Sequence, residues 1–377
     1  MSTPLVVFGE DWGGHPSSTQ HLISRLMGEH GTVWVNSIGL RRPRPTLPDI
    51  VRVLKKGLSA LVRNGSSLKD PAGITEPAAL VSPFTIPVPR NAIERKFNRI
   101  FLGHKIRRAL KVLPEEKPIL WTSLPTAVDL LGCADERAVV YYCGDDFSGL
   151  AGVDHAEVAK AEERLVERAD LIVTASTQLV KKFPAEKTVY LPHGVDVDLF
   201  STPLPPPADL ALDRPVAGFY GSVSDWLNVD LMQAVASALP EWRFVFIGDV
   251  HTDVSALKSL ENVEFLGPRH HHELPAYVQN WSVSLLPFRD NAQIRACNPL
   301  KLREYLSAGT PIVSTNFPAL NGYRDLIAVA DGANDFATAI SSSLKDDPAC
   351  RTLRTERMKR ESWDERARDL ATHLSRL

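Results

Sequence analysis

Short runs of aliphatic and β-branched residues alternate with amphipathic stretches along most of the chain. This alternation is typical of βαβ units and predicts an α/β protein built on parallel sheets. In the first half, the pattern predicts strands at 5–8, 32–36, 119–122, 138–142, 171–174 and 188–191. It predicts helices at 18–28, 91–111, 155–169 and 176–183, the third beginning with a capping box of Asp154 and Glu157.

A proline-rich segment then interrupts the alternation. Residues 201–215 carry four prolines in their first seven positions, which excludes a helix or a central strand and indicates a linker. After it, the pattern predicts strands at 216–220, 243–247, 263–265, 283–286 and 311–314, and helices at 227–239, 273–279 and 299–308. The last stretch predicts a helix with Ser362 and Glu365 as its capping box.

This order predicts two Rossmann-like domains that face each other across a cleft, with ligands beyond the carboxyl ends of the strands. We expect a first domain at 1–200, a linker at 201–215, a second domain at 216–355 and a final helix at 356–377 that crosses back to the first domain. The length of 377 residues suits two domains.

Composition excludes several classes of protein. An apolar fraction of 44% argues against long disorder, and no apolar run approaches the roughly 20 residues of a membrane span. The chain opens in strand-like sequence, so no signal peptide is expected. The four cysteines form no CxxC pair, which argues against a disulfide framework or a zinc site and favours the reducing cytoplasm.

Positive and negative charges are distributed unevenly along the chain. Residues 1–112 carry a net charge of +10, and the remainder carries −12. Residues 90–111 hold eight Lys/Arg and one acid, Glu94, with apolar residues at helical spacing: Ile93, Phe97, Ile100, Phe101, Ile106 and Leu110. Together with Arg41, Arg42, Arg44, Lys55 and Lys56, this pattern predicts a basic amphipathic helix on an anionic membrane surface, peripheral to the inner face of the cell membrane. An ordinary domain helix with a solvated basic face stays open, and nucleic acid is disfavoured because no aromatic platforms are interleaved.

The segment NPLKLREYLSAGTPIVS, residues 298–314, predicts a well-delimited helix. Asn298 is expected to cap it, Pro299 to open it, and Gly309 to end it in the left-handed conformation. Lys301 lies in the first turn and Glu304 three residues later on the same face. An ammonium at a helix N-terminus suits a diphosphate and the carboxylate suits a ribose diol, although a surface Lys–Glu pair would have the same spacing.

A second motif is GFYGS, residues 218–222, at the end of a predicted strand. Its glycines allow backbone N–H groups to approach a phosphate, and Ser222 adds a hydroxyl, although a tight turn explains the motif equally well. The GxGxxG spacing of a dinucleotide fold is absent, which argues against a dehydrogenase.

Several motifs in order resemble GT-B glycosyltransferases, especially bacterial enzymes of exopolysaccharide and teichuronic-acid assembly related to the xanthan glucuronosyltransferase. In the second half they are GFYGSVSDWLNVDLM, WRFVFIGD, NVEFLGPRHHHELPAYVQNWSVSLLPF and NPLKLREYLSAGTPIVST. The first half adds YYCGDDFSG, ADLIVTAS and LPHGVDVDLF. The resemblance extends well over residues 140–315 and loosely over the first 140.

The resemblance implies a donor site for a nucleotide sugar, with a UDP-sugar favoured. Glu304 would hold the ribose hydroxyls, Lys301 would neutralise the diphosphate leaving group, and Gly221 with Ser222 would line the phosphates. The loop at 268–270 would follow the base, which adds Arg269 and His270 to the donor-binding residues. Asn298, at the start of the 298–314 segment, is the last member of this set. Charge stabilisation by a lysine and a helix end implies that no metal is needed. Adjacent histidines 270–272 cannot easily converge on one ion, so no metal site is expected there.

The acceptor side is expected in the first domain. Asp145 and Asp146 follow a predicted strand, at the sheet edge where a carboxylate can take a proton from an acceptor hydroxyl, and Asp145 is favoured slightly. An Asp-rich turn that caps the next segment is the alternative. Asp11 and His15 are further acceptor-side candidates. Ala296 stands where retaining relatives carry an acidic residue, which favours inversion.

Taken together, the sequence predicts a metal-independent glycosyltransferase of cell-surface or extracellular polysaccharide synthesis. It would move a sugar from a nucleotide donor to a lipid-linked (polyprenyl) or growing saccharide. Two alternatives stay open, a sugar-nucleotide epimerase of the same fold and a non-catalytic protein that binds nucleotide sugars.

Overall fold

The structure is a computed structural model that describes residues 3–14, 17–40, 76–83, 85–149 and 153–377. The chain divides into two compact units. The first comprises residues 1–192 together with 366–377, and the second comprises residues 193–365. The proline-rich segment 201–215 lies within the second unit. The last helix, α14 (Trp363–Leu374), starts in the second unit, and its residues from Arg366 onward belong to the first.

The first unit is built on a seven-stranded parallel sheet in the order β3-β2-β1-β4-β5-β6-β7. Its strands are β1 (Leu5–Phe8), β2 (Thr32–Val35), β3 (Ala79–Val81), β4 (Ile119–Thr122), β5 (Ala138–Cys143), β6 (Leu171–Thr174) and β7 (Thr188–Tyr190). Strand order reverses between β1 and β4, so the loops after these strands diverge at this position. In such sheets, ligands bind beyond the carboxyl ends of the strands at this switch point.

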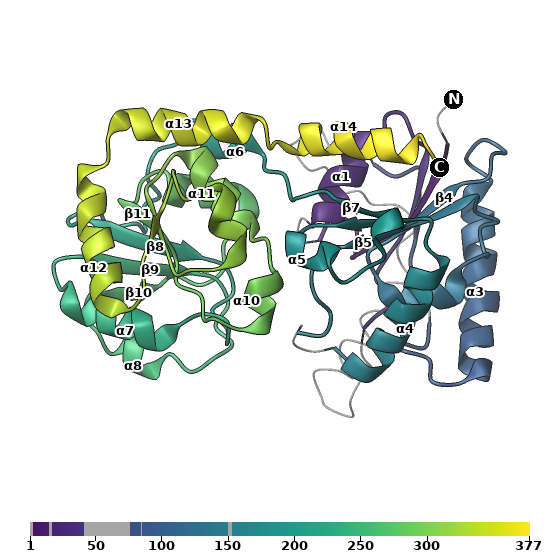
Figure 1. Ribbon diagram of the computed structural model, residues 1–377, viewed down its shortest axis with the longest axis horizontal. Coiled ribbons are helices and arrows are strands. Elements are labelled where there is room, and N and C mark those ends of the chain that lie inside the picture. The colour runs from purple at the N-terminus through teal and green to yellow at the C-terminus, as the bar shows by residue number, and fades with distance from the viewer. Residues whose placement is uncertain (1–2, 15–16, 41–75, 84, 150–152) are drawn as a thin grey trace. The chain divides into compact units, whose positions relative to one another are not determined.

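Helices cover both faces of this sheet. They are α1 (Ser18–Leu26), α3 (Ala92–Leu110), the 3-10 helix η1 (Pro125–Leu130), α4 (His155–Arg168), α5 (Thr177–Val180) and the 3-10 helix η2 (Ala185–Lys187). One core cluster joins α3, η1 and α4 to the sheet through buried side chains such as Ile106, Leu130 and Leu165. Figure 1 shows α1 and α14 together on the opposite side of this sheet.

The second unit repeats the design with six parallel strands in the order β10-β9-β8-β11-β12-β13. The strands are β8 (Val216–Tyr220), β9 (Arg243–Ile247), β10 (Val263–Phe265), β11 (Val283–Leu286), β12 (Ile312–Ser314) and β13 (Ala328–Val329). The chain moves outward through β9 and β10 and then returns to the other side of β8, so the switch point lies between β8 and β11.

The helices of this unit begin with α6 (Val197–Ser201), α7 (Val229–Ala238), α8 (Ser255–Lys258), η3 (His271–Glu273) and α9 (Leu274–Val278). They continue with α10 (Ala292–Ala296), α11 (Leu300–Ala308), η4 (Pro318–Gly322), α12 (Ala333–Ser342), η5 (Ser343–Lys345) and α13 (Pro348–Lys359). α11 packs against α6 and α13, which fixes it beside the sheet.

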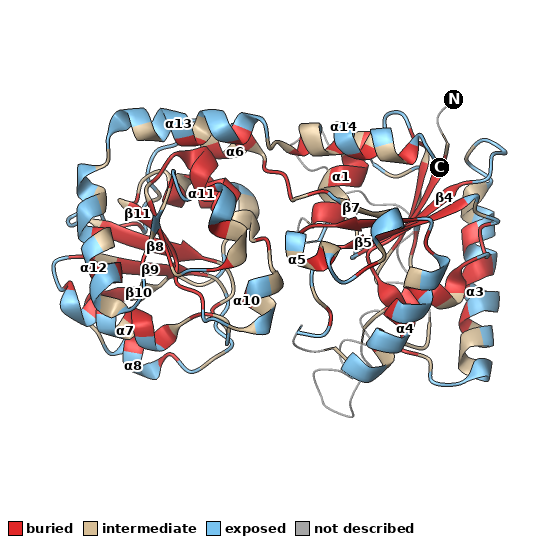
Figure 2. Ribbon diagram, in the orientation of Figure 1, coloured by how far each residue is buried: buried red, intermediate tan, exposed pale blue. Residues whose placement is uncertain are grey.

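The central strands are buried on both sides, as Figure 2 shows in red. Side chains of both parities along β1, β4 and β8 are inaccessible to solvent, because helices cover both faces of a parallel sheet. Such strands read as continuous apolar runs, and this explains why the predicted bounds of several of them agree with the structure. The α/β class and the paired parallel sheets are confirmed.

The structure tests three local predictions about helices, and the capping box expected at Asp154 is wrong. Asp154 makes no capping hydrogen bond at the start of α4, because its carboxylate pairs with Arg90 at 3.3 Å. The predicted apolar face of α3 is largely exposed: Ile93 is 81% accessible, and Ile100 and Phe101 are each 55% accessible. The buried residues of α3 are Asn98, Leu102, Gly103 and Ile106, and of these Ile106 belongs to the predicted apolar set. At α14, the backbone N–H of Glu365 does donate to Ser362 Oγ at 3.2 Å, as predicted.

Candidate nucleotide-sugar site

The central helix of the candidate site is α11, which lies in the chain between β11 and β12, two neighbouring strands of the second sheet. It begins at Leu300 and ends at Gly309, whose φ of 76° places it in the left-handed region that glycine tolerates best. The predicted C-terminal end is therefore confirmed. The predicted cap is wrong, because no side chain caps the N-terminus and the residue at that position is Pro299.

Asn298 has another partner. Its Oδ1 accepts a hydrogen bond from Arg303 Nη1 at 2.6 Å, and Arg303 Nε lies 3.0 Å from a carboxylate oxygen of Glu361. The Arg303 side chain is 2% exposed, and a buried guanidinium needs such partners to offset its desolvation. Asn298 thus anchors the start of α11 through Arg303, and a direct role in donor binding stays a prediction.

Glu304 lies on α11 and is 8% exposed. Its Oε1 is 2.8 Å from His271 Nε2, and its Oε2 accepts a hydrogen bond from the hydroxyl of Tyr220 at the end of β8. Burial alone would raise the pKa of the Glu304 carboxyl. The hydrogen bonds from His271 and Tyr220 and the charge of Lys301 outweigh burial, so its pKa is lowered and the carboxylate stays ionised.

Lys301 occupies the first turn of α11. Burial lowers the pKa of its ammonium, and the nearby charge of Glu304 only partly offsets this. Among the residues that the structure describes, Lys301 has no ion pair or hydrogen-bond partner, and its Nζ lies 5.6 Å from the centre of the Phe219 ring. The surface Lys–Glu pair that the spacing allowed is therefore absent within the described structure. An ammonium in this setting favours an anionic ligand.

The two glycines of GFYGS are required for different structural reasons. Gly218 lies in β8 under the indole of Trp281, where a Cβ would come within 1.8 Å of the ring. Gly221 follows β8 with a φ of 121°, and a Cβ there would lie 2.3 Å from Lys301 Cε and 2.6 Å from Nζ. The half-buried Ser222 is the next residue. Gly221 thus lets the lysine side chain pass directly over the turn at the carboxyl end of the central strand.

Two predicted donor-binding residues in the loop after β10, Arg269 and His270, make contacts away from Lys301 and Glu304. Arg269 turns toward the proline-rich segment, with Nη2 2.5 Å from Asp209 and Nε 3.0 Å from the Tyr277 hydroxyl. His270 is exposed, and its ring stacks on that of His272 with centroids 5.6 Å apart. The donor-binding roles of Arg269 and His270 stay predictions.

His271 is the histidine of this loop that reaches Glu304, a contact that was not expected from the sequence. Tyr220 and Tyr305 were missed as well: the Tyr305 hydroxyl accepts a hydrogen bond from the backbone N–H of Tyr220 at 3.2 Å. No signal in the sequence separates His271 from its two neighbours, because the choice depends on how the short helix η3 is oriented. No group of three or more potential metal ligands occurs among the described residues.

In the first unit, the two aspartates in the loop after β5 have different contacts. Asp146 accepts hydrogen bonds from Ser148 and lies 3.0 Å from the ammonium of Lys182, and these contacts lower its pKa although burial opposes them. Lys182 also pairs with Glu162 at 2.8 Å. The alternative of a structural aspartate in a turn thus describes Asp146.

The carboxylate of Asp145 makes no ion pair or hydrogen bond with any residue in the described part of the chain. Its pKa is raised, because surrounding protein reduces the solvation of the charged form and because Glu10 and Asp146 add negative charge nearby. The residue nevertheless keeps an exposed surface. A carboxylate that is both accessible and more basic than usual is suited to accept a proton.

The remaining acceptor-side candidates are Asp11 and His15. Asp11 is exposed in the loop after β1, and its Oδ1 accepts a hydrogen bond from the backbone N–H of Ser37 at 3.1 Å. His15 lies outside the described residues, as do Arg41, Arg42, Arg44, Lys55 and Lys56.

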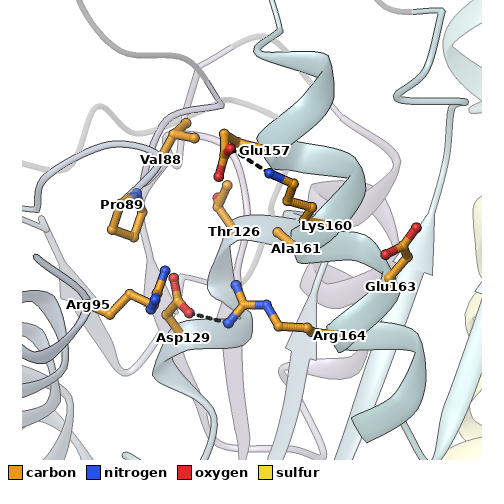
Figure 3. A pocket seen from close by; sticks show the side chains of 10 residues that line it. All are labelled: Val88, Pro89, Arg95, Thr126, Asp129, Glu157, Lys160, Ala161, Glu163 and Arg164. Carbon is orange, nitrogen blue, oxygen red and sulfur yellow. Dashed lines mark hydrogen bonds and ion pairs between the residues drawn. The ribbon is translucent and has the colours of Figure 1, made fainter. Parts of the chain in front are cut away.

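A cavity of about 320 Å³ also lies in the first unit, between α3, η1 and α4 (Figure 3). Three basic and three acidic side chains line it, and Arg164 pairs with Asp129 across it at 2.8 Å. None of the predicted site residues lines this cavity. Its opposite charges balance one another, so it shows no preference for an anionic ligand.

Comparisons with known proteins show which sequences and folds this chain is similar to. Residues 214–346 match the family described as "Glycosyl transferases group 1". TuaH of Bacillus subtilis, assigned to teichuronic acid biosynthesis as a glycosyltransferase, is 30% identical over 250 residues, which cover 59% of this chain and 63% of TuaH.

Two solved structures share the fold over the full chain. HepE of Anabaena, crystallised with UDP and glucose, has a TM-score of 0.68 at 14% identity, with 100% of both chains covered. Sucrose-phosphate synthase of Thermosynechococcus elongatus has a TM-score of 0.70 at 14% identity, covering 100% of this chain and 99% of the other. The chain therefore has the GT-B fold of these proteins.

Proposed function

We propose that this chain, which carries a group 1 glycosyl transferase domain at residues 214–346 in a GT-B fold, transfers a sugar from a nucleotide donor to a saccharide acceptor. The second unit would bind the donor, and the first would bind the acceptor. TuaH, which is similar over 250 residues, is assigned to teichuronic acid biosynthesis, and this supports an acceptor from cell-surface or extracellular polysaccharide.

The observation that carries the proposal is the position of Lys301 and Glu304, one turn apart on α11 and close to the carboxyl end of β8. The ammonium lies over Gly221 without a protein counter-ion in the described structure, and the carboxylate is ionised and buried one turn away. A diphosphate supplies the anion that Lys301 lacks, and a ribose diol supplies two hydroxyl donors for Glu304.

The chemistry of the transfer follows from these groups. The acceptor oxygen bonds to the anomeric carbon while the bond from that carbon to the diphosphate oxygen breaks, and the electron pair leaves with the diphosphate. Lys301 and the N-terminus of α11 stabilise the charge that develops on the leaving group. Asp145 takes the proton of the acceptor hydroxyl, which fits transfer with inversion at the anomeric carbon.

The proposed donor is a UDP-sugar, because HepE has been crystallised with UDP and with UDP-glucose. The site needs no divalent cation in this proposal, since a lysine and a helix N-terminus provide the positive charge. The proposed acceptor is a lipid-linked (polyprenyl) or growing saccharide. Among the described residues no helix is long and apolar enough to cross a membrane.

Attachment to an anionic membrane surface is part of the proposal, through the outward face of α3. Ile93, Phe97, Ile100 and Phe101 follow one another at helical spacing on that face, and the rings of Phe97 and Phe101 lie 4.3 Å apart. His104, Arg107, Arg108 and Lys111 continue the same face toward the C-terminal end of the helix. Exposed apolar side chains beside cations suit the boundary between lipid headgroups and acyl chains.

The deciding experiment measures release of UDP from a panel of UDP-sugars, with and without a polyprenyl-linked saccharide. We expect acceptor-dependent release of UDP and a product that is longer by one sugar. Conversion of the donor to another UDP-sugar without acceptor would instead identify an epimerase. Donor binding with no turnover under any condition would identify a binding protein, and either result would overturn the proposal.

A further inference from the structure

The carboxylate of Glu304 is held from two sides by residues of two different elements. His271, from the loop after β10, lies 2.8 Å from Oε1, and the Tyr220 hydroxyl at the end of β8 donates to Oε2. Tyr220 is in turn fixed by its own backbone N–H, which donates to the Tyr305 hydroxyl at 3.2 Å. Both oxygens of one carboxylate are thus fixed before any ligand is bound.

This arrangement leaves part of the carboxylate available. An ionised carboxylate offers about four lone-pair sites, and the two protein donors occupy only two of them. The remaining two match the two hydroxyls of a ribose diol. Without the protein donors, the Glu304 side chain would have to give up rotational freedom when the ligand binds, and that loss weakens binding.

The surroundings of His271 favour its cationic form. Its ring is held edge-on against Phe200 of α6 with centroids 5.6 Å apart. The charged groups that act on it are Glu304 and Asp196, which raise its pKa although burial opposes them. The other titratable groups nearby are Lys301 on α11 and, within the loop, Arg269, His270, His272 and Glu273.

We propose that His271 and Tyr220 are positioning residues of the donor site, which orient Glu304 for the ribose of a nucleoside diphosphate and make donor affinity depend on the proton of His271. This inference rests on the proposed function. His271 acts through Glu304 and touches no reacting atom. When His271 loses its proton, Glu304 loses its cationic partner, and donor affinity decreases.

The test compares His271→Phe with His272→Phe by calorimetric binding of UDP to the full chain. Phenylalanine keeps the ring that packs against Phe200 but removes the contact with Glu304, and His272 is an exposed neighbour that makes no contact with Glu304. We expect UDP to bind about tenfold more weakly to His271→Phe and as in the wild type to His272→Phe. His271→Gln, which retains an N–H donor, should restore most of the affinity.

A pH series adds a readout that a purely structural role would not change. Between about pH 6 and pH 9, the wild type should lose UDP affinity more steeply than His271→Gln, because the glutamine does not titrate. Tyr220→Phe removes only the second donor and should raise the KM for the donor while changing kcat little. Equal pH slopes, or wild-type UDP affinity in both His271→Phe and Tyr220→Phe, would overturn the inference.

The outcome also separates this inference from the proposed function. If Glu304→Gln and Lys301→Ala abolish UDP binding while His271→Phe does not change it, the donor site stands and only the positioning role is lost. If Glu304→Gln and Lys301→Ala bind UDP normally, the donor site itself is wrong.

Discussion

The ammonium of Lys182 lies 3.0 Å from a carboxylate oxygen of Asp146, whereas the adjacent Asp145 has no such partner in the described structure. Two neighbouring aspartates in one loop are therefore given opposite properties. Lys182 and Ser148 lower the pKa of Asp146 and fix its carboxylate, whereas reduced solvation, together with the charges of Glu10 and Asp146, raises the pKa of Asp145. This difference assigns the proposed proton transfer to Asp145 and the support of the loop to Asp146.

Replacement of the two aspartates should have different effects. We expect Asp145→Asn to lower kcat about 10²- to 10⁴-fold with little change in thermal stability, because it removes the proton acceptor. The main effect of Asp146→Asn should be a lower melting temperature, because the substitution leaves Lys182 with Glu162 as its remaining ion-pair partner. Steady-state kinetics and thermal unfolding of both variants measure this difference. Equal kinetic defects in the two variants would contradict the assignment.

The rate should fall on the acidic side at a higher pH than an ordinary aspartate would give. A general base works only when ionised, so activity is present above its pKa and is lost as the pH falls through it. The pKa of Asp145 is raised by the surrounding protein and by Glu10 and Asp146, which moves this acidic limb upward. Glu10→Gln removes one negative charge and should move the limb back toward lower pH. A limb that does not move in Glu10→Gln speaks against this electrostatic coupling.

Loss of the Lys301 ammonium should slow transfer. We expect Lys301→Ala to reduce kcat about 10²-fold or more, because the leaving diphosphate loses the cation that stabilises its developing charge. Lys345→Ala, at an exposed lysine of the same unit, is the matched control and should leave turnover unchanged. Release of UDP under saturating donor measures both. Near-normal turnover in Lys301→Ala would mean that the buried ammonium has another purpose.

A side chain at Gly221 should impair both the fold and the site. The φ of 121° is unfavourable for any residue with a Cβ, and the added methyl would lie 2.3 Å from Lys301 Cε. We expect Gly221→Ala to destabilise the protein by about 1–3 kcal/mol and to weaken UDP binding, since Lys301 has to move. Gly28→Ala is the control, because a Cβ at Gly28 meets nothing within 4 Å. Unfolding curves and UDP titrations compare the two variants.

The outward face of α3 should control binding to lipid vesicles. We expect a variant with Ile100→Ser and Phe101→Ser, both side chains being exposed, to lose most of its binding to vesicles of anionic lipid while keeping its stability. Leu353→Ser, at an exposed residue of α13, is the control. Vesicle flotation with anionic and with neutral lipid measures the effect. Unchanged binding of the α3 variant to anionic vesicles would contradict the membrane role.

Much of the architecture and part of the site could be predicted from local sequence patterns. Strands β1, β4, β6, β8, β9 and β11 have the predicted bounds, because strands buried on both faces are nearly continuous apolar runs. The partly exposed strand β10 has its predicted bounds as well. The C-terminal end of α11 at Gly309 was predicted for a similar reason, since the left-handed conformation there favours glycine. Several elements were missed: the strands β3 and β13, the short helices α6, α8 and α10, and the longer helices α12 and α13. Segments of two to five residues carry too little periodicity to be recognised, and the single final helix expected at 356–377 is instead the end of α13 followed by α14.

The amino-acid sequence by itself determined the α/β class, the two parallel sheets and the candidate pair of Lys301 and Glu304, because these depend on residue type and spacing along the chain. The tertiary structure decided which neighbours those residues have. His271 rather than His270 contacts Glu304, Asn298 binds Arg303 instead of capping α11, and Lys182 separates Asp146 from Asp145. Each of these choices depends on contacts between residues distant in sequence or on the orientation of a short loop, and hydrophobic periodicity contains no information about either.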